Sequence, residues 1–448
     1  MCQEIEKNNY CPAGHPYKVF VNGFCPLCTE EHFIHEFQTW SSGNTNIDNV
    51  IQESQINDKY FKLHWIPYEN FQNIEHITDG GHGSVYSAEI ENGIKWKWDF
   101  IEQDWKYYLI GKVALKEIKD SRLDVVEFLK VMKTANENEY GAIILYYGIS
   151  KNPSTQNYII VMKLFDGDLH NFLTKKFWDL DWESKILLLS SIAECLERLH
   201  EKNLIHCDLH SGNILIDLNF YFFDPGSDLG IDFGLYKLEN DLILNSNKNN
   251  KISGSVPYVP PEVLRENGFT REGDIYSFGG IMYEIITAQR PFADQAHDTY
   301  LMIDICNGVR PKVPDFMLNW IPEWYLDLMY RCWSDDPSER PSAVELFDLF
   351  CDALNNTLDN NSALQLKIAD ENQKNTSKSR KQELFKLFSY SNKLHPQSCY
   401  ISRHIHTFHG LHYLLEDLKS GKSADPNLLL KSNESTTSDT SNTYDIIY

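Results

Sequence analysis

Hydrophobic and polar residues divide the chain into four zones. From Tyr68 to Leu354 apolar positions are dense, alternating at first and then recurring at helical spacing. The run SKILLLSSIAECLERLH, residues 184–200, is a clear helical example. The pattern predicts a globular α+β domain over residues 68–354, in which a strand-rich part precedes a helical part.

The segments on either side of this domain are more polar. Residues 38–67 predict a linker with one short amphipathic run, formed by Ile47, Val50, Ile51 and Ile56. Residues 355–448 are rich in Ser, Asn and Lys, and such sequence buries too little apolar area to offset chain entropy. The sequence therefore predicts a largely disordered tail, with one short helix at residues 410–419.

Composition and charge exclude several classes of protein. The chain has 448 residues, more than one core usually supports, and 41 basic against 64 acidic residues give a net charge of −23. This balance argues against nucleic-acid binding. We expect no membrane segment, because no window of about 18 apolar residues occurs. Ten cysteines without a secretory signal indicate reduced thiols or metal ligands, and we expect the cytosol, with the nucleus as a second compartment.

A glycine-rich turn opens the candidate chemistry. The segment ITDGGHGSVYSAEI, residues 77–90, places Gly80 and Gly83 before Val85 in a strand–turn–strand pattern that suits close approach to phosphates. Farther on, KVALKEI predicts a strand ending near Lys116. Since side chains alternate along a strand, Lys116 shares a face with the small Ala114.

The strongest signal is the segment LIHCDLHSGNIL. Asp208 is followed five residues later by Asn213, which pairs a candidate base with a candidate metal ligand in one loop. The segments LGIDFGLYK and PPE follow, with Glu262 thirty residues beyond Asp232. Five ordered motifs over this length are a highly specific signal.

With these motifs the chain resembles a eukaryotic protein kinase. The segment GDIYSFGGIMYEIITAQRPF is similar to the buried helix of the large kinase lobe, and RCWSDDPSERP is similar to the closing segment of tyrosine-kinase-like domains. The lead-in from WSSGN to WIPY resembles kinases expanded in some fungi. The resemblance implies a bilobal fold, with a small β-rich lobe carrying one helix, a larger helical lobe, and ATP, Mg²⁺ and protein substrates and signalling partners.

The resemblance also implies roles for individual residues. Lys116 would pair with the α- and β-phosphates, Asp208 would accept the substrate proton, and Asn213 and Asp232 would hold Mg²⁺. The residues implied around the nucleotide are Gly80, Gly83, Val85, Ala114, Leu215, a gatekeeper Met162, and a hinge over 163–165 that includes Phe165. Glu262 would pair with Arg340, and Asp274 would hold the backbone of the catalytic loop.

The chain departs from the family pattern at several positions. Thr78 replaces the first glycine of the loop, His82 its aromatic tip, Cys207 the usual Arg, and His210 the usual Lys. The helix glutamate that pairs with Lys116 is also displaced. Val131 stands fifteen residues past Lys116, so Glu127 is the favoured partner, with Glu137 and Glu139 farther along.

Two aspartates compete for the second metal position. Asp228 lies nearer to Asn213, but Leu229 and Ile231 alternate into Asp232 as a strand should. We therefore choose Asp232 and interpret 219–228 as an enlarged turn. A second enlarged segment, 91–111, is rich in aromatic residues; it predicts packing over the small lobe, with a docking surface as the alternative.

The first 37 residues contain a Cys/His cluster. Cys11, His15, Cys25 and Cys28 have the spacing C-x3-H-x9-C-x2-C, a nitrogen and sulfur set that suits a closed structural zinc site. The alternative is an extension with free thiols.

The sequence favours an active Ser/Thr kinase. GSVPYVPPE, with Ser255 at the hydroxyl position, resembles the corresponding segment of Ser/Thr kinases. Tyrosine or dual specificity remains open. The rival from another class is a pseudokinase that serves as a scaffold, favoured by Thr78, Val131, Cys207 and His210.

Overall fold

The computed structural model describes most of the chain, with the exception of several internal and terminal segments. The described ranges are 11–15, 23–57, 62–80, 83–119, 125–136, 144–217, 229–232, 237–238, 251–355, 357–391, 394–407, 420 and 425–428. His82, Glu137, Glu139, Asp228 and the predicted helix at 410–419 lie outside them. None of the described helices is long and apolar enough to cross a membrane.

The small lobe is a six-stranded sheet with the order β1-β7-β8-β6-β3-β2. Its strands are β1 (His64–Trp65), β2 (Phe71–Gly80), β3 (Gly83–Ile90), β6 (Lys112–Ile118), β7 (Tyr146–Lys151) and β8 (Tyr158–Lys163). All pairs are antiparallel except β1 with β7. Helix α4 (Val125–Asn136) packs its buried face into the core that lies beneath the sheet.

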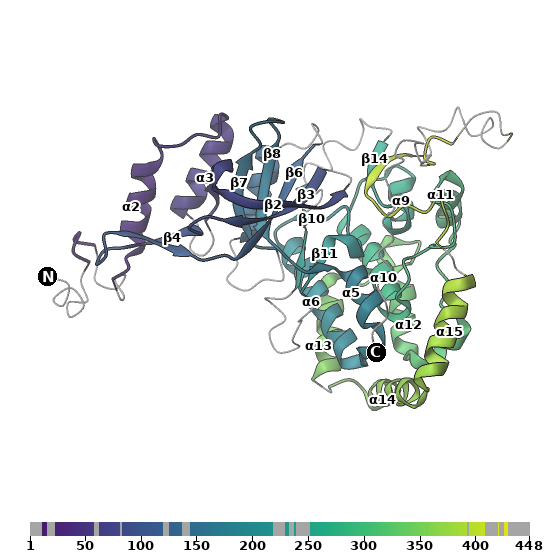
Figure 1. Cartoon of the computed structure of the whole chain (residues 1–448). Coiled ribbons are helices and arrows are strands. Elements are labelled where there is room, and N and C mark those ends of the chain that lie inside the picture. Colours follow the sequence, from purple (N-terminus) through teal and green to yellow (C-terminus); the bar gives the residue numbers. More distant parts are fainter. Residues whose placement is uncertain are drawn as a thin grey trace.

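The large lobe is mainly helical, as Figure 1 shows. Its helices are α5 (Leu169–Lys176), α6 (Trp182–Glu201), α9 (Pro261–Leu264), α10 (Arg271–Thr287), α11 (Thr299–Cys306), α12 (Glu323–Cys332) and α13 (Ala343–Leu354). Short strands lie between the helices, namely β9 (Gly167–Asp168), β10 (Leu204–Ile205), β11 (Ile214–Ile216), β12 (Leu229–Ile231), β13 (Lys237–Leu238) and β14 (Lys251–Gly254).

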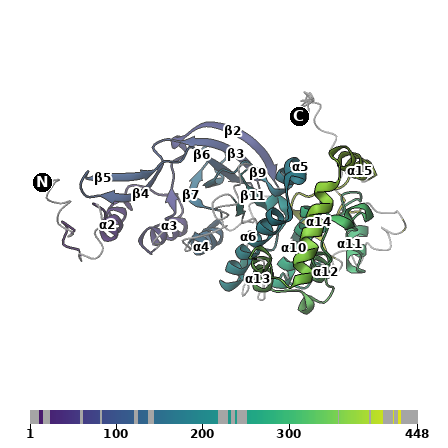
Figure 2. The ribbon, with the colours of Figure 1, turned by 90° about the horizontal axis from the view of Figure 1, so that it is seen from below.

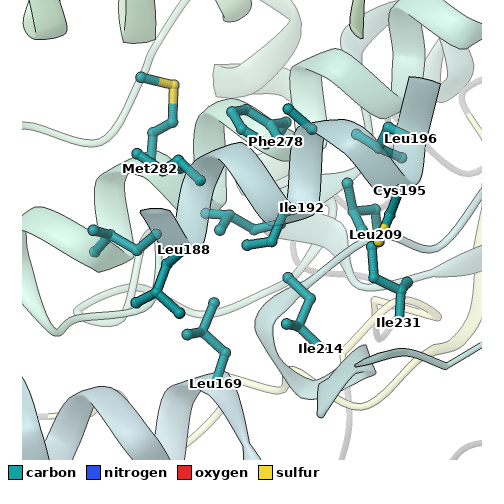
Figure 3. Close-up of a cluster of buried hydrophobic side chains, with 14 of the residues drawn as sticks. Leu169, Leu188, Ile192, Cys195, Leu196, Leu209, Ile214, Ile231, Phe278 and Met282 are labelled. Carbon is teal, nitrogen blue, oxygen red and sulfur yellow. The ribbon is translucent and has the colours of Figure 1, made fainter. Parts of the chain in front are cut away.

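The core of the large lobe supports the loop that carries Asp208. Figure 3 shows Leu188 and Ile192 of α6 facing Phe278 and Met282 of α10. Leu209, Ile214 and Ile231 lie at one side of this cluster and are each at most 1% exposed. Because apolar side chains on both sides of Asp208 and Asn213 are buried there, the polar residues between them are held at a fixed position.

The predicted linker is a structured part of the small lobe. Residues 45–57 form α3 (Thr45–Asn57), which packs against α4 (Figure 2). Ile47, Val50 and Ile51 are buried in the main core. The amphipathic run seen in the sequence therefore forms a helix that braces α4.

The aromatic segment 91–111 forms a separate hairpin of β4 (Ile94–Asp99) and β5 (Asp104–Tyr108). This hairpin packs against α2 (Pro26–Glu36), as Figure 2 shows. Trp105 Nε1 donates to Glu36 Oε1 at 2.8 Å, and Trp98 N donates to Thr29 Oγ1 at 3.1 Å. The enlarged segment also packs over the small lobe, as the favoured interpretation expected, because Ile94 and Ile110 join the core on that side of the sheet.

Part of the tail departs from the predicted disorder. It contains α14 (Asn360–Asn375), α15 (Lys378–Ser391) and β15 (Arg403–His406). Polar anchors hold α14 to the large lobe: Lys185 Nζ donates to Gln373 Oε1 at 3.1 Å, and Trp182 N donates to Asp370 Oδ1 at 3.1 Å. These hydrogen bonds compensate for the low apolar content on which the prediction of disorder rested.

Candidate active site

Lys116 occupies the position on β6 that the strand pattern predicted. The register pairs Lys116 with Val85 of β3, and Ala114 with Met162 of β8. Directly opposed residues of antiparallel strands point to the same face, so these four side chains share one face of the sheet. Ala114 and Met162 are buried, and the Lys116 side chain is 14% exposed.

Lys116 forms an ion pair with Asp232. The Nζ–Oδ2 distance is 2.6 Å, and both side chains are largely buried. The sequence had favoured Glu127 as the partner of this lysine. Glu127 lies in the first turn of α4, but the carboxylate bound to Lys116 is that of Asp232. Val131 packs into the core at 3% exposure, which accounts for an apolar residue at the position expected for the helix glutamate.

The strand pair β11–β12 brings the two candidate metal ligands together. Ile214 pairs with Ile231, so the residues just outside this pair, Asn213 and Asp232, are neighbours. The backbone N–H of Asp232 donates to the carbonyl of Asn213 at 2.7 Å. The strand Leu229–Ile231 leads directly into Asp232, which was the argument for choosing this residue.

Asn213 is also bound to Asp208. Its Nδ2 donates to the Asp208 carbonyl at 2.8 Å and lies 3.4 Å from Asp208 Oδ2. The short 3-10 turn Ser211–Asn213 makes this contact possible by reversing the chain between the two residues. Lys116, Asp208, Asn213 and Asp232 therefore form one connected site from four separate segments.

A buried carboxylate holds the catalytic loop from below. Asp274 of α10 is 2% exposed and accepts hydrogen bonds from the backbone N–H groups of His206 and Cys207 at 2.8 and 3.0 Å. His200 of α6 contacts the same carboxylate at 3.0 Å, a partner that the sequence did not reveal. Cys207 is held at φ 65°, a conformation that L-residues rarely adopt without such support.

Burial alters the chemistry of the candidate base. Burial raises the pKa of Asp208 to about 7, against the opposing effects of the Ser402 and Asn213 side chains. A carboxylate with a pKa near neutrality accepts a proton more readily than an ordinary surface aspartate. Asp208 is thus placed to act as a general base.

His210 stands beside this base. Its Nδ1 accepts from the N–H of Gly212 at 3.1 Å, so the neutral ring carries its proton on Nε2. Nε2 lies 3.8 Å from Asp208 Oδ1. His210 therefore lies near Asp208 at the position where the family usually has a lysine.

The donor set fits a divalent cation that prefers oxygen. Asp232 Oδ1 is buried and has no hydrogen-bond partner among the described residues, while Oδ2 binds Lys116. The Nδ2 of Asn213 is used by Asp208, which leaves the amide oxygen as its metal-binding atom. One carboxylate oxygen and one amide oxygen match the few protein ligands with which Mg²⁺ is held beside substrate phosphates.

The glycine-rich turn approaches the backbone of β6. Gly83 has φ 157°, and a Cβ at this position would lie 1.9 Å from the carbonyl oxygen of Glu117. Gly80 pairs with Gly83 at the end of the hairpin. Only glycine fits at 83, because any side chain there would collide with the neighbouring strand.

The remaining residues implied for adenine lie at the junction of the lobes. Leu215 of β11 pairs with Asp168 on one side and Gly230 on the other. Gly230 lies against the Phe165 ring: a Cβ at this position would be 2.9 Å from Cζ of Phe165. Phe165 and Leu215 are both partly buried against the main core.

The predicted Glu262–Arg340 pair is present. Arg340 binds the carboxylate with both Nη1 and Nη2, at 2.7 and 2.8 Å. Arg340 also donates to the carbonyls of Glu272 and Ser334. The pair joins α9 to the segment before α13 and fixes the end of the segment that follows Asp232.

The N-terminal cysteines and histidine form a compact cluster. The four ligand atoms of Cys11, His15, Cys25 and Cys28 lie within 4.8 Å of one another. His15 Nδ1 is 3.5, 3.4 and 3.3 Å from the three sulfur atoms. Tetrahedral zinc with ordinary bond lengths gives S···N separations of about 3.6 Å, which these distances approach. His15 Nε2 contacts Glu31 at 3.2 Å, the carboxylate contact that often orients a metal-binding histidine.

A two-lobed fold whose site combines a lysine, a candidate base and two oxygen ligands is typical of enzymes that transfer phosphoryl groups. The family model described as "Protein tyrosine and serine/threonine kinase" matches residues 71–350, and the chain belongs to this family. The resemblance to eukaryotic protein kinases is therefore confirmed.

Several curated proteins are similar over this domain. "Probable serine/threonine-protein kinase drkD" of Dictyostelium discoideum is 30% identical over 275 residues, which cover 61% of this chain and 19% of the relative. "Receptor-interacting serine/threonine-protein kinase 4" of Homo sapiens is 27% identical over 280 residues, 61% of this chain and 30% of the relative. The chain thus spans less than a third of the length of either relative.

Proposed function

We propose that the chain is an ATP- and Mg²⁺-dependent protein kinase that transfers the γ-phosphate to Ser or Thr hydroxyls of protein substrates. The observation that carries this proposal is the convergence of Lys116, Asp208, Asn213 and Asp232. Family membership and relatives named as serine/threonine kinases support it.

In the proposed reaction each residue has one task. Lys116 binds the α- and β-phosphates, and Asp208 orients the substrate hydroxyl and accepts its proton as the oxygen bonds to the γ-phosphorus. The bond from the γ-phosphorus to the bridging oxygen breaks, and ADP leaves. Mg²⁺, when bound by Asn213 and Asp232, neutralises charge on the phosphates.

The preference for Ser or Thr hydroxyls is supported by relatives named as serine/threonine kinases and by the Ser255 segment, which resembles that of Ser/Thr kinases. Ser255 is 1% exposed and lines the same small cavity as Asp208. Phosphoamino-acid analysis of a protein substrate labelled from γ-³²P-ATP tests the specificity. We expect label on serine or threonine; label confined to tyrosine would contradict this assignment.

The pseudokinase hypothesis has one structural observation in its favour, which is that Lys116 is paired with Asp232 rather than with a carboxylate of α4. Thermal stability and phosphoryl transfer, measured together, separate the two hypotheses. ATP with Mg²⁺ stabilises any chain that binds it, by mass action, whereas only an enzyme also transfers phosphate. Nucleotide stabilisation without transfer would favour the scaffold.

We also propose that Cys11, His15, Cys25 and Cys28 hold a structural zinc ion. The closeness of the four ligand atoms and the contact between His15 and Glu31 support the site. All four positions of a tetrahedral ion would be filled by protein, which is typical of structural zinc. The ion would fix α2 against the β4–β5 hairpin, since Cys25 and Cys28 lie at the start of this helix.

The proposed zinc site predicts how many zinc ions each chain binds. We expect about one zinc ion per chain by elemental analysis, and loss of that ion in Cys25→Ser, because one of its four ligands is removed. Cys351→Ser, which changes a cysteine of α13 far along the chain from the cluster, is the control and should keep the ion. Equal zinc content in both variants would refute the site.

A further inference from the structure

A segment of the C-terminal tail is docked beside the catalytic loop. Strand β15 pairs antiparallel with β14, with Lys251 opposite His406 and Gly254 opposite Arg403. Figure 1 shows the yellow tail strand lying beside β14, although about 150 residues separate the two in sequence. The tail thus adds a strand to the segment that precedes Ser255.

Side chains hold the tail at this position. The Tyr400 hydroxyl donates to the carbonyl of Pro291 at 2.9 Å, and the Tyr400 ring packs edge-on against His297 with centroids 4.7 Å apart. His297 Nδ1 accepts from the N–H of Cys399 at 3.0 Å, and Arg403 donates to the His297 carbonyl at 2.5 Å. The contacts on both sides of Ser402 therefore fix its place.

The register places Ser402 at the candidate base. Gly254 is next to Asp208, since a Cβ at Gly254 would lie 3.9 Å from Asp208 Oδ1. Arg403 pairs with Gly254, and Ser402 is the residue immediately before it. Ser402 is 6% exposed, and its buried hydroxyl has no hydrogen-bond partner of ordinary geometry within the described residues.

The Ser402 side chain lies close enough to the Asp208 carboxylate to interact with it. A serine oxygen held next to a general base is the arrangement that a hydroxyl substrate requires. The tail therefore presents a hydroxyl to the site from within the same chain.

We propose that Ser402 is an intramolecular phosphorylation site, the first substrate of this chain's own active site. This inference rests on the kinase activity proposed above. The Ser402 oxygen bonds to the γ-phosphorus of ATP, its proton passes to Asp208, and the bond from the γ-phosphorus to the bridging oxygen breaks to release ADP. No further reactant is needed.

Phosphorylated Ser402 would fit the site beside Asp208 less well than the unmodified serine. A phosphoserine carries a charge of about −1.5 to −2, and it would lie beside the carboxylate of Asp208. Repulsion between these like charges disfavours the docked tail. Phosphorylation of Ser402 is therefore expected to release β15 from β14 and to open the site to other hydroxyl substrates.

The test uses the full chain, treated first with a phosphatase and then incubated with ATP and Mg²⁺. We expect mass spectrometry to find phosphate at Ser402, with a rate constant that does not change on dilution, as an intramolecular reaction requires. Ser402→Ala should lose this site alone. The matched control is Ser398→Ala, whose hydroxyl donates to the His395 carbonyl at 2.8 Å; this variant should label Ser402 at the normal rate.

A variant that weakens the docking of the tail provides the second test, and its readout is again the rate of Ser402 labelling. Tyr400→Ala should slow Ser402 labelling by about tenfold or more, because a buried aromatic anchor is lost, and Tyr400→Phe should restore most of the rate. The proposal is overturned if Ser402 stays unlabelled while another protein is phosphorylated, if its labelling accelerates with protein concentration, or if Tyr400→Ala labels it normally. Absence of any transfer, to Ser402 or to another protein, overturns the kinase assignment together with this proposal.

Discussion

Asp208→Asn is expected to reduce phosphoryl transfer by about 10²–10⁴-fold, the usual contribution of a general base. The amide keeps the shape of the side chain, but it does not accept the proton of a hydroxyl. The measurement is kcat for transfer from ATP to a protein substrate. The matched control is Asp335→Asn, a change at an exposed side chain that binds Arg310 at 2.5 Å, and this variant should transfer at the normal rate.

The same variant should be more stable than the wild type in alkaline solution. Because burial raises the pKa of Asp208 to about 7, the folded protein retains a proton there that the unfolded chain loses at lower pH. Ionisation of the buried carboxylate therefore lowers the stability of the wild type as pH rises toward about 7, and the amide avoids this cost. Without metal or nucleotide, we expect Asp208→Asn to have the higher Tm at about pH 8 and a smaller advantage at about pH 5. A Tm difference that is constant with pH would show that the carboxylate is not buried as described.

Arg340→Met is expected to lower the free energy of unfolding by about 3–5 kcal/mol. The variant leaves Glu262 buried without its partner, and both Arg340 nitrogens that bind this carboxylate are lost. Arg340 has no exposed side-chain surface, so water does not replace the lost contacts readily. The measurement is denaturant unfolding, from the midpoint and the slope.

An exposed arginine provides the control for this effect. Arg331 binds Glu345 at 2.7 Å, but both side chains are close to half exposed, so Arg331→Met should cost less than about 1 kcal/mol. The two variants remove the same group from two ion pairs that differ in burial. Equal losses in both would contradict the structural role given to the Glu262–Arg340 pair.

The resemblance to protein kinases implied the two-lobed fold and most of the site, and local patterns predicted individual helices and strands within them. Helical spacing over residues 184–200 matched α6, which is capped by Asp181, whose side chain accepts from the Ser184 N–H. The alternation in KVALKEI placed Ala114 and Lys116 on one face of β6. Strand alternation into Asp232 likewise selected the carboxylate that now binds Lys116.

The contacts that the sequence did not predict are between distant segments. The partner of Lys116 depends on how α4 lies relative to the sheet, and spacing along the chain does not determine that. The aromatic richness of residues 91–111 was recognised, but the contacts of Trp98 and Trp105 with Thr29 and Glu36 depend on the placement of α2. Ser402 carries no local signal at all, since its proximity to Asp208 follows from the register of β14 and β15.

The most direct test of the account measures transfer of ³²P from the γ position of ATP to a protein hydroxyl, by the wild type and by Asp232→Asn. Asp232 connects Lys116 to Asn213, and its Oδ1 has no hydrogen-bond partner in the part of the chain that the structure describes. The account predicts transfer by the wild type that requires Mg²⁺, and a nearly complete loss of transfer in the folded variant. Undiminished transfer by Asp232→Asn, or none by a folded wild type that binds ATP, would contradict it.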